Sequence, residues 1–195
     1  MKNSLKIISI LMLCLLMSCK KNTLLVDLDG NSYKTKKYGK TIWMIENLKV
    51  KQDNVGNSIK YFIPNNDSIN IPNFGLLYDY EIACKVCPKG WRIPTNEDWK
   101  ELFKLNNIAS NYKDRKYWGN DKNSNVSLFS VRPSGYGNNG AHFNKFNSSA
   151  ILWSKTKENK HFIWTYIIEK GNDSIRKASQ HPTYAFSIRC VKSLP

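Results

Sequence analysis

The chain has five cysteines, at positions 14, 19, 84, 87 and 190. Cys84 and Cys87 have the Cys-x-x-Cys spacing, which suits a redox pair when it opens a helix in a thioredoxin-like setting. Pro88 and Gly90 follow immediately and would break such a helix, so the sequence disfavours redox chemistry. A zinc site is also disfavoured, because there is no second Cys-x-x-Cys and the three histidines are dispersed.

The N-terminus has the pattern of a bacterial export signal. Lys2 and Lys6 make the start positive, and a roughly 11-residue apolar run, 7–17, is too short for the about 20 residues of a membrane span. Residues 16–19, Leu-Met-Ser-Cys, resemble the lipobox of bacterial lipoproteins. This resemblance implies cleavage before Cys19 and lipid on its thiol. The alternative is an ordinary signal peptide with a coincidental cysteine.

The expected leader divides the chain into three parts. Residues 1–18 would be the signal peptide, 19–26 a lipidated tether, and 27–192 the domain. Two or more acyl chains on Cys19 would hold the protein stably, whereas one chain holds it only marginally. The membrane is therefore an expected partner, and the expected location is the cell envelope, as an outer-membrane lipoprotein on the periplasmic or the surface face.

Composition describes a folded, basic domain. Hydrophobic residues make up 41% of the chain and aromatic residues 12%, which excludes a disordered protein. The formal net charge is +15, and it falls by the charge of two lysines when the leader is removed. Such charge could attract nucleic acid, anionic headgroups or acidic glycans. The lysines are scattered, however, which favours an ordinary solvated surface, and export makes nucleic acid an unexpected partner.

The periodicity of the sequence predicts an α+β domain without internal repeats. The best-marked helix begins after Thr95, a good N-cap, with Asp98 at the third helical position. Trp99, Leu102 and Phe103 then recur at the spacing of a buried helix face. One or two further helical turns are expected within 76–83, and a long surface loop over 50–75 with a short strand at 59–63. Strands are expected at 33–37, 41–45, 129–132, 151–154, 161–169, 174–179 and 185–191.

Several blocks occur in an order and at a spacing that resemble one known family. The blocks are Asp29-Gly30-Asn31, Trp43-Met44, Glu46-Asn47-Leu48, Cys87-Pro88-Lys89-Gly90-Trp91-Arg92-Ile93-Pro94-Thr95, Leu152-Trp153-Ser154 and Phe186-Ser187-Ile188-Arg189-Cys190-Val191. Together they resemble the Fibrobacter succinogenes major paralogous domain over residues 27–192, nearly the whole mature chain. Proteins of this family are largely uncharacterised, exported and often lipoproteins.

The resemblance implies a compact C-type lectin-like α+β domain, with a twisted antiparallel sheet, one well-defined helix and long loops. Three cysteines remain after the leader and Cys19, enough for one bridge and one leftover thiol. The resemblance implies that Cys87 and Cys190 form the disulfide. It gives no role to Cys84, which could be free and buried or could compete with Cys87.

The expected function is non-catalytic binding of glycan, peptide or protein by a membrane-anchored envelope lipoprotein. The candidate ligand residues lie in aromatic and Asn-rich segments: Trp118, Tyr136, Asn138, Asn139 and His142. Aromatic faces stack on sugars, and Asn amides both donate to and accept from hydroxyls. The competing interpretation is that such aromatic residues belong to the core.

Neither a cofactor nor a metal is expected. The Glu-Pro-Asn and Gln-Pro-Asp tripeptides of calcium-dependent lectins are absent from the sequence. An enzyme related to formylglycine-generating proteins would need paired late cysteines, and Cys190 is the only late one. The alternatives to a binding module are therefore a structural or adhesion component of the surface and, less favoured, such an enzyme.

Overall fold

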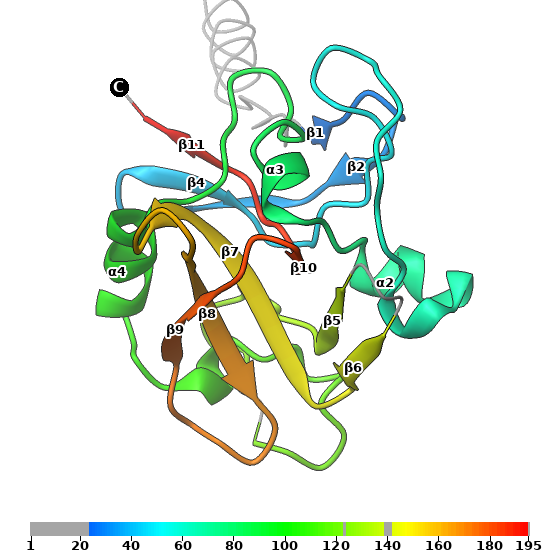
Figure 1. Ribbon diagram of the computed structural model, residues 1–195. Coiled ribbons are helices and arrows are strands. Elements are labelled where there is room, and N and C mark those ends of the chain that lie inside the picture. Colours follow the sequence, from blue (N-terminus) through cyan, green and yellow to red (C-terminus); the bar gives the residue numbers. More distant parts are fainter. Residues whose placement is uncertain (1–23, 123, 139–141, 195) are drawn as a thin grey trace, which may run out of the picture.

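A mixed six-stranded sheet forms the centre of the computed structural model, which describes residues 24–122, 124–138 and 142–194 (Figure 1). The sheet has the order β10-β5-β7-β8-β9, and β6 pairs with β5 beside this path. Its strands are β5 (Ser134–Asn138), β6 (Phe143–Phe146), β7 (Ser149–Lys157), β8 (Ile163–Glu169), β9 (Arg176–Gln180) and β10 (Tyr184–Ala185). All pairs are antiparallel except β5 with β7, so the expected antiparallel sheet contains one parallel pair.

Two smaller sheets come mainly from the N-terminal third of the chain. The first pairs β1 (Leu25–Val26) with β2 (Ser32–Tyr33). The second has the order β11-β4-β3 and consists of β3 (Thr35–Tyr38), β4 (Thr41–Met44) and β11 (Val191–Ser193). β3 and β4 form the predicted early hairpin, and Gly39 in its turn has a φ of 57°, which suits glycine. The last strand thus returns to pair with one of the first.

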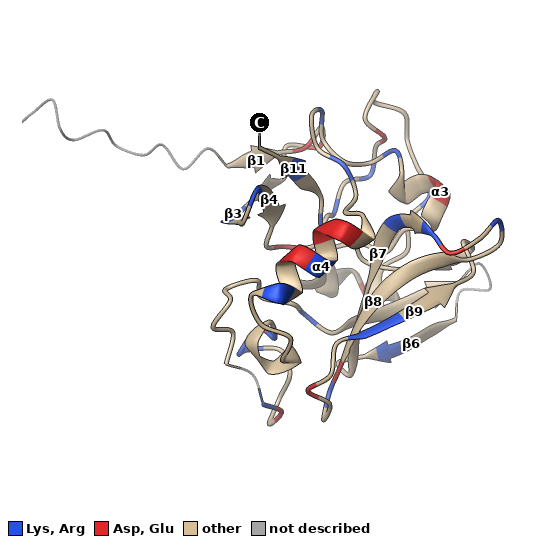
Figure 2. Ribbon diagram, turned by 90° about the vertical axis from the view of Figure 1, so that its left-hand side faces the viewer, with Lys and Arg blue, Asp and Glu red and all other residues tan. Residues whose placement is uncertain are grey.

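Helix α4 (Asn96–Lys104) begins where the sequence predicts. The Thr95 hydroxyl accepts from the Asp98 N–H, and the Asp98 carboxylate accepts from the Thr95 N–H at 2.7 Å, which completes a capping box. Acidic residues occupy its first turn and Lys104 its last, an arrangement that suits the helix dipole (Figure 2). Trp99 and Leu102 are buried against the main sheet.

The remaining helices are single turns. The structure has α2 (Ile71–Phe74), α3 (Tyr80–Ala83) and 3-10 turns at Pro64–Asn66, Ser68–Asn70 and Ala109–Asn111. The segment expected as a long loop therefore contains three short turns, and its expected strand is reduced to one bridge between Phe62 and Leu77. Among the described residues, no helix is long and apolar enough to cross a membrane.

The two faces of β7 belong to different core clusters. Successive side chains of a strand point to opposite faces, so Ile151 and Trp153 lie in one cluster while Ala150 and Leu152 lie in the other. Helix α4 covers the second face. The first face packs against Met44, Tyr78, Phe186 and Ile188, among others. The architecture is mostly β-sheet with short helices, compatible with the expected α+β class.

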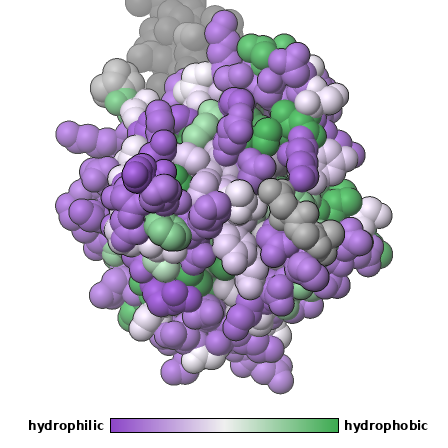
Figure 3. Space-filling view, in the orientation of Figure 1, coloured by the Kyte–Doolittle hydropathy of each residue, from purple (hydrophilic) through white to green (hydrophobic). Residues whose placement is uncertain are grey.

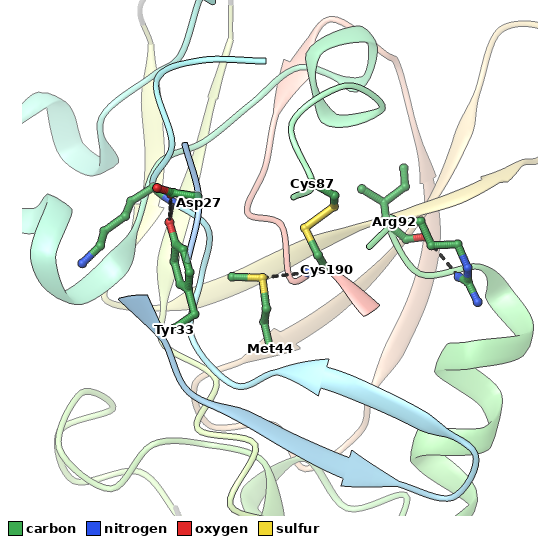
Figure 4. Close-up of a disulfide and its surroundings, with 8 residues drawn as sticks. Asp27, Tyr33, Met44, Cys87, Arg92 and Cys190 are labelled. Atoms are coloured by element: carbon green, nitrogen blue, oxygen red, sulfur yellow. Dashed lines mark hydrogen bonds between the residues drawn. A yellow bond between two sulfur atoms is a disulfide. The ribbon is translucent and has the colours of Figure 1, made fainter. Parts of the chain in front are cut away.

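Cys87 and Cys190 form a disulfide, which confirms the pairing that the family resemblance implies (Figure 4). Their Cα atoms are 5.8 Å apart across a sequence separation of 103 residues. The bridge joins the loop before α4 to the segment before β11. Met44 lies beside it, and its sulfur accepts a hydrogen bond from the Cys190 N–H at 3.4 Å. Cys84 is free and exposed, so it is not a buried thiol.

Candidate functional site

The expected ligand residues do not all lie at one surface. The side chain of Trp118 is fully buried, and its Nε1 donates to the Val131 carbonyl at 2.8 Å. Its expected role in ligand contact is therefore wrong, because a ligand outside the core cannot reach the ring. The ring stabilises the interior, where the Lys113 ammonium lies 5.0 Å from its centroid. Asn139 lies outside the described residues.

The other expected residues belong to one hairpin. Tyr136 and Asn138 are two positions apart on β5, so their side chains share one face of the strand. His142 is exposed and lies directly before β6. Its backbone N–H donates to the Asn138 Oδ1 at 3.3 Å. This hairpin borders a concavity on the main sheet, and the structure places only Tyr136 of the expected residues in its lining.

We call this concavity the sheet hollow. It has a volume of about 170 Å³ and lies on the face of the sheet opposite α4. Its lining comes from all six strands and the segment after β10: Tyr136, Lys145, Ser149, Ile151, Ile167, Glu169, Arg176, Gln180, Tyr184 and Phe186. Pockets for drug-sized ligands usually measure about 300–1,000 Å³. The sheet hollow therefore suits a small unit, such as one ring or one side chain.

Three aromatic rings form one wall of the sheet hollow. Tyr184 stacks on Phe186 with an interplanar angle of 9° and centroids 6.0 Å apart. Tyr136 meets Tyr184 edge to face at 5.8 Å and Phe186 at 6.0 Å. Phe186 is buried, whereas the two tyrosines are half-buried. Ring faces and hydroxyls are thus both available at the edge of the wall.

The lining of the sheet hollow also contains polar side chains besides this aromatic wall. Ser149, at the start of β7, is 1% exposed, and its Oγ has no hydrogen-bond partner within the described residues. Glu169 and Arg176 form a loose ion pair at 3.6 Å, with the arginine half exposed. Gln180 adds an amide from the end of β9. A ligand with hydroxyl or amide groups could bond to Gln180 and compete for the ion pair, and it could satisfy the buried Ser149 hydroxyl only if the side chains over that hydroxyl moved.

The hairpin that carries Tyr136 depends on a close approach between β5 and β6. Gly135 has a φ of 65°, and a Cβ atom there would lie 2.4 Å from the Asn144 carbonyl oxygen. Only glycine tolerates both conditions. The Ser-Gly-Tyr-Gly segment, 134–137, resembles a turn in the sequence, so both β5 and β6 were absent from the sequence-based prediction. Packing between the two strands explains why they form.

The face of the molecule drawn in Figure 3 is mostly hydrophilic. Figure 3 shows a pale strip near the middle of the view, bordered by strongly hydrophilic side chains. A larger concavity, of about 530 Å³, lies beside α3 and is lined in part by Tyr80, Cys84 and Lys157. Partial cover of the sulfur raises the pKa of the Cys84 thiol, despite the opposing effect of Tyr80 and nearby lysines. A raised pKa leaves less of this thiol as thiolate, which is the nucleophilic form.

Within the described residues, no group of three or more His, Cys, Asp or Glu side chains could hold a metal ion. Sequence reasoning missed every residue of the sheet hollow except Tyr136, and those with polar groups include Ser149, Glu169, Arg176, Gln180 and Tyr184. These five residues lie on four strands, and each looks like an ordinary strand residue in its local sequence. Only the strand order β10-β5-β7-β8-β9 brings them together.

No curated protein matches the chain. No solved structure matches it either. The sequence model described as the Fibrobacter succinogenes major domain, in contrast, matches residues 37–192, which is most of the chain and includes every residue of the sheet hollow. The match also contains both cysteines of the disulfide and the helix α4. The chain belongs to the Fibrobacter succinogenes major domain family.

Proposed function

We propose that this protein is a lipid-anchored lipoprotein of the cell envelope, with a non-catalytic, lectin-like domain that binds glycan in the sheet hollow. The observation that carries the proposal is the aromatic-walled concavity, whose lining includes Ser149, a residue with a buried hydroxyl that lacks a partner in the described part of the chain. An unsatisfied buried hydroxyl costs stability. A hydroxyl-bearing ligand that reached this hydroxyl would offset that cost.

Glycan is favoured over peptide by the mixture of groups and by the size of the sheet hollow. Sugar rings present apolar faces to aromatic side chains and hydroxyls to polar ones, and Tyr184 and Gln180 offer these two kinds of contact. The small volume accommodates one sugar unit at a chain end. The edge-to-face tyrosines provide a wall without a deep apolar slot of the kind that a large hydrophobic side chain needs.

A binding role is favoured over catalysis by the lining itself. None of the lining residues is a cysteine or a histidine, and Cys190 is bonded to Cys87. Glu169, the carboxylate in the lining, pairs with Arg176. The lectin-like assignment of the domain rests on the family resemblance together with the α+β architecture and this disulfide. A structural or adhesion role without a small ligand is the second candidate.

A glycan array with the Cys19→Ala chain, exported without acylation, tests the proposal. Glycans that bind are then measured by calorimetry with Tyr184→Ala, which removes one face of the aromatic wall. The loss of a stacking contact of about 1–2 kcal/mol predicts affinity that is weaker by roughly 5–30-fold. Tyr61→Ala is the matched control, because Tyr61 is also half-buried but lies outside the lining. Unchanged affinity in Tyr184→Ala, or no binding to any glycan, would contradict the proposal.

A further inference from the structure

The segment 24–28 exposes three of its four apolar side chains. Leu24, Val26 and Leu28 are 56%, 51% and 57% exposed, whereas Leu25 and Asp27 between them are more buried. Strand β1 is only Leu25–Val26, and Leu28 lies in the turn that follows it. Val26 and Leu28 nevertheless line one concavity, so these two exposed apolar side chains border the same face of the molecule. This face therefore fits contact with something other than water.

Neighbouring loops extend this apolar face. Val55, 76% exposed, lies in the loop after Asp53, and the adjacent Asn54 lines the same shallow concavity as Val26 and Leu28. The Asn54 N–H donates to the Lys85 carbonyl at 2.8 Å, which fixes this loop beside the segment before the disulfide. We call Leu24, Val26, Leu28 and Val55 the apolar rim. Exposed lysines, Lys51 and Lys89, lie on the adjoining segments.

We propose that the apolar rim lies on the membrane surface, with its side chains at the boundary between headgroups and acyl chains. The inference rests on the lipid anchor of the proposed function. Four residues separate Cys19 from Leu24, and a fully extended step of about 3.4 Å per residue limits their reach to roughly 17 Å. The rim is thus held close to lipid. Apolar side chains that enter this boundary typically do so by about 5–10 Å.

This orientation would direct the sheet hollow away from the membrane. In Figure 1, β1 and the loop that follows β4 lie at the top, while β5, β6 and the end of β8 lie toward the opposite end of the molecule. The sheet hollow is lined in part from those strands, by Tyr136, Lys145 and Glu169 among others. A docked rim would therefore hold the site open to ligands beyond the membrane, whereas a freely swinging tether would not fix its direction.

Depth-dependent quenching in vesicles tests the docking. The acylated chain, in a Cys84→Ser background, receives one fluorophore at Val55→Cys or at Lys170→Cys. It is then inserted into phosphatidylethanolamine–phosphatidylglycerol vesicles that contain lipid spin-labelled near the headgroup. Val55 is remote from Cys19 in sequence, but its neighbour Asn54 lies beside Val26 and Leu28 in the fold, so the tether alone would also bring position 55 toward the lipid. Removal of the apolar side chains of the rim separates docking from tethering. We expect several-fold stronger quenching at position 55 than at position 170, which lies at the end of β8.

Removal of the rim provides the second measurement. The triple variant Leu24→Ser, Val26→Ser, Leu28→Ser should stay anchored but lose the excess quenching at position 55. A matched triple variant of equally exposed apolar residues, Leu105→Ser, Val126→Ser, Leu128→Ser, should keep it. Equal quenching at positions 55 and 170 of an acylated chain would overturn the docking but leave the proposed anchor intact. Dimerisation of the chain through the rim would have the same consequence. If mass spectrometry shows that Cys19 has no acyl chains, the result overturns the lipid anchor and the docking that rests on it.

Discussion

At the scale of single residues, two buried serines on β7 differ in what they do. The Ser154 hydroxyl accepts from the Thr156 N–H at 3.2 Å, whereas the Ser149 hydroxyl has no partner within the described residues. Both side chains are at most 1% exposed. A satisfied buried hydroxyl supports folding, and an unsatisfied one opposes it. The proposed function explains why a strand in this sheet would contain the second kind.

Ser149→Ala is therefore expected to stabilise the free protein while weakening ligand binding. Removing an unsatisfied hydroxyl should raise the free energy of unfolding by about 0.5–1.5 kcal/mol, as measured by urea denaturation. Ser154→Ala is the control on the same strand, and it should lower that free energy because it removes a partner of the Thr156 N–H. If Ser149→Ala destabilises the chain, the hydroxyl is satisfied after all, and the proposed site loses one of its supports.

Arg189 is a fully buried cation that holds a loop in place. Its guanidinium donates to the Asn47 Oδ1 at 2.9 Å and to the carbonyls of Phe129 and Ser130, and it stacks on the Phe129 ring. Burial lowers the pKa of this guanidinium to about 9, with Arg132 contributing in the same direction. The planar fork satisfies three acceptors that a lysine could not reach together.

We therefore expect Arg189→Lys to destabilise the fold by about 2–4 kcal/mol, because buried acceptors lose their donors. Chemical denaturation would measure the loss. Arg176→Lys offers the comparison, since Arg176 is half exposed and its loose pair with Glu169 should contribute at most about 1 kcal/mol. Similar losses in the two variants would show that Arg189 is not the anchor of this loop.

At the scale of elements, the predictions that succeeded are those with local signals. Helix α4 has a cap, an amphipathic face and charges at both ends, and β7, β8 and β9 have β-branched or alternating residues. The sequence could not show β5, because Gly135 and Gly137 indicate a turn, and the strand forms through its pairing with β6, β7 and β10. The expected strand 129–132 depends likewise on tertiary contacts, and only Val131 forms a bridge.

Asp98, at the N-terminus of α4, should make the free energy of unfolding fall as the pH becomes acidic. Burial alone would raise the pKa of Asp98, but hydrogen bonds from Arg92 and from the Thr95 backbone outweigh it and hold the pKa below 3.8. A carboxyl whose folded pKa is depressed contributes stability above its unfolded pKa, and loses it as pH falls through the folded value. Asp98→Asn should flatten the decline in stability below about pH 4.

Denaturation midpoints measured from pH 5 to pH 2 would test this expectation. Glu101→Gln serves as the comparison, because Glu101 is exposed on the same helix and pairs only with Lys104 at the surface. Its acid dependence should match that of the unmodified chain. A slope in Asp98→Asn as steep as in Glu101→Gln would place the acid sensitivity elsewhere.

At the scale of the whole molecule, the disulfide ties the C-terminal part of the chain to its middle. The pairing of Cys87 with Cys190 followed from family resemblance, since three cysteines alone permit other pairings. The sheet hollow could not be predicted in this way, because Tyr136, Ser149 and Tyr184 become neighbours only when separate strands assemble. Of the residues expected to bind a ligand, Tyr136 lines the sheet hollow. Trp118 lies in the core instead, as the competing interpretation predicted.

The disulfide should be the main covalent contribution to stability. It closes a loop of 103 residues, so replacing Cys87 and Cys190 by serine should lower the free energy of unfolding by about 2–5 kcal/mol. Cys84→Ser is the internal control, because Cys84 is exposed and free, and its removal should change stability by less than about 0.5 kcal/mol. Urea denaturation of the three proteins, with peptide mapping under non-reducing conditions, gives both the energy and the pairing. A Cys84–Cys87 peptide in the unmodified chain, or equal stability of the double variant, would show that the bridge does not join the loop before α4 to β11, and the lectin-like assignment would lose its covalent support.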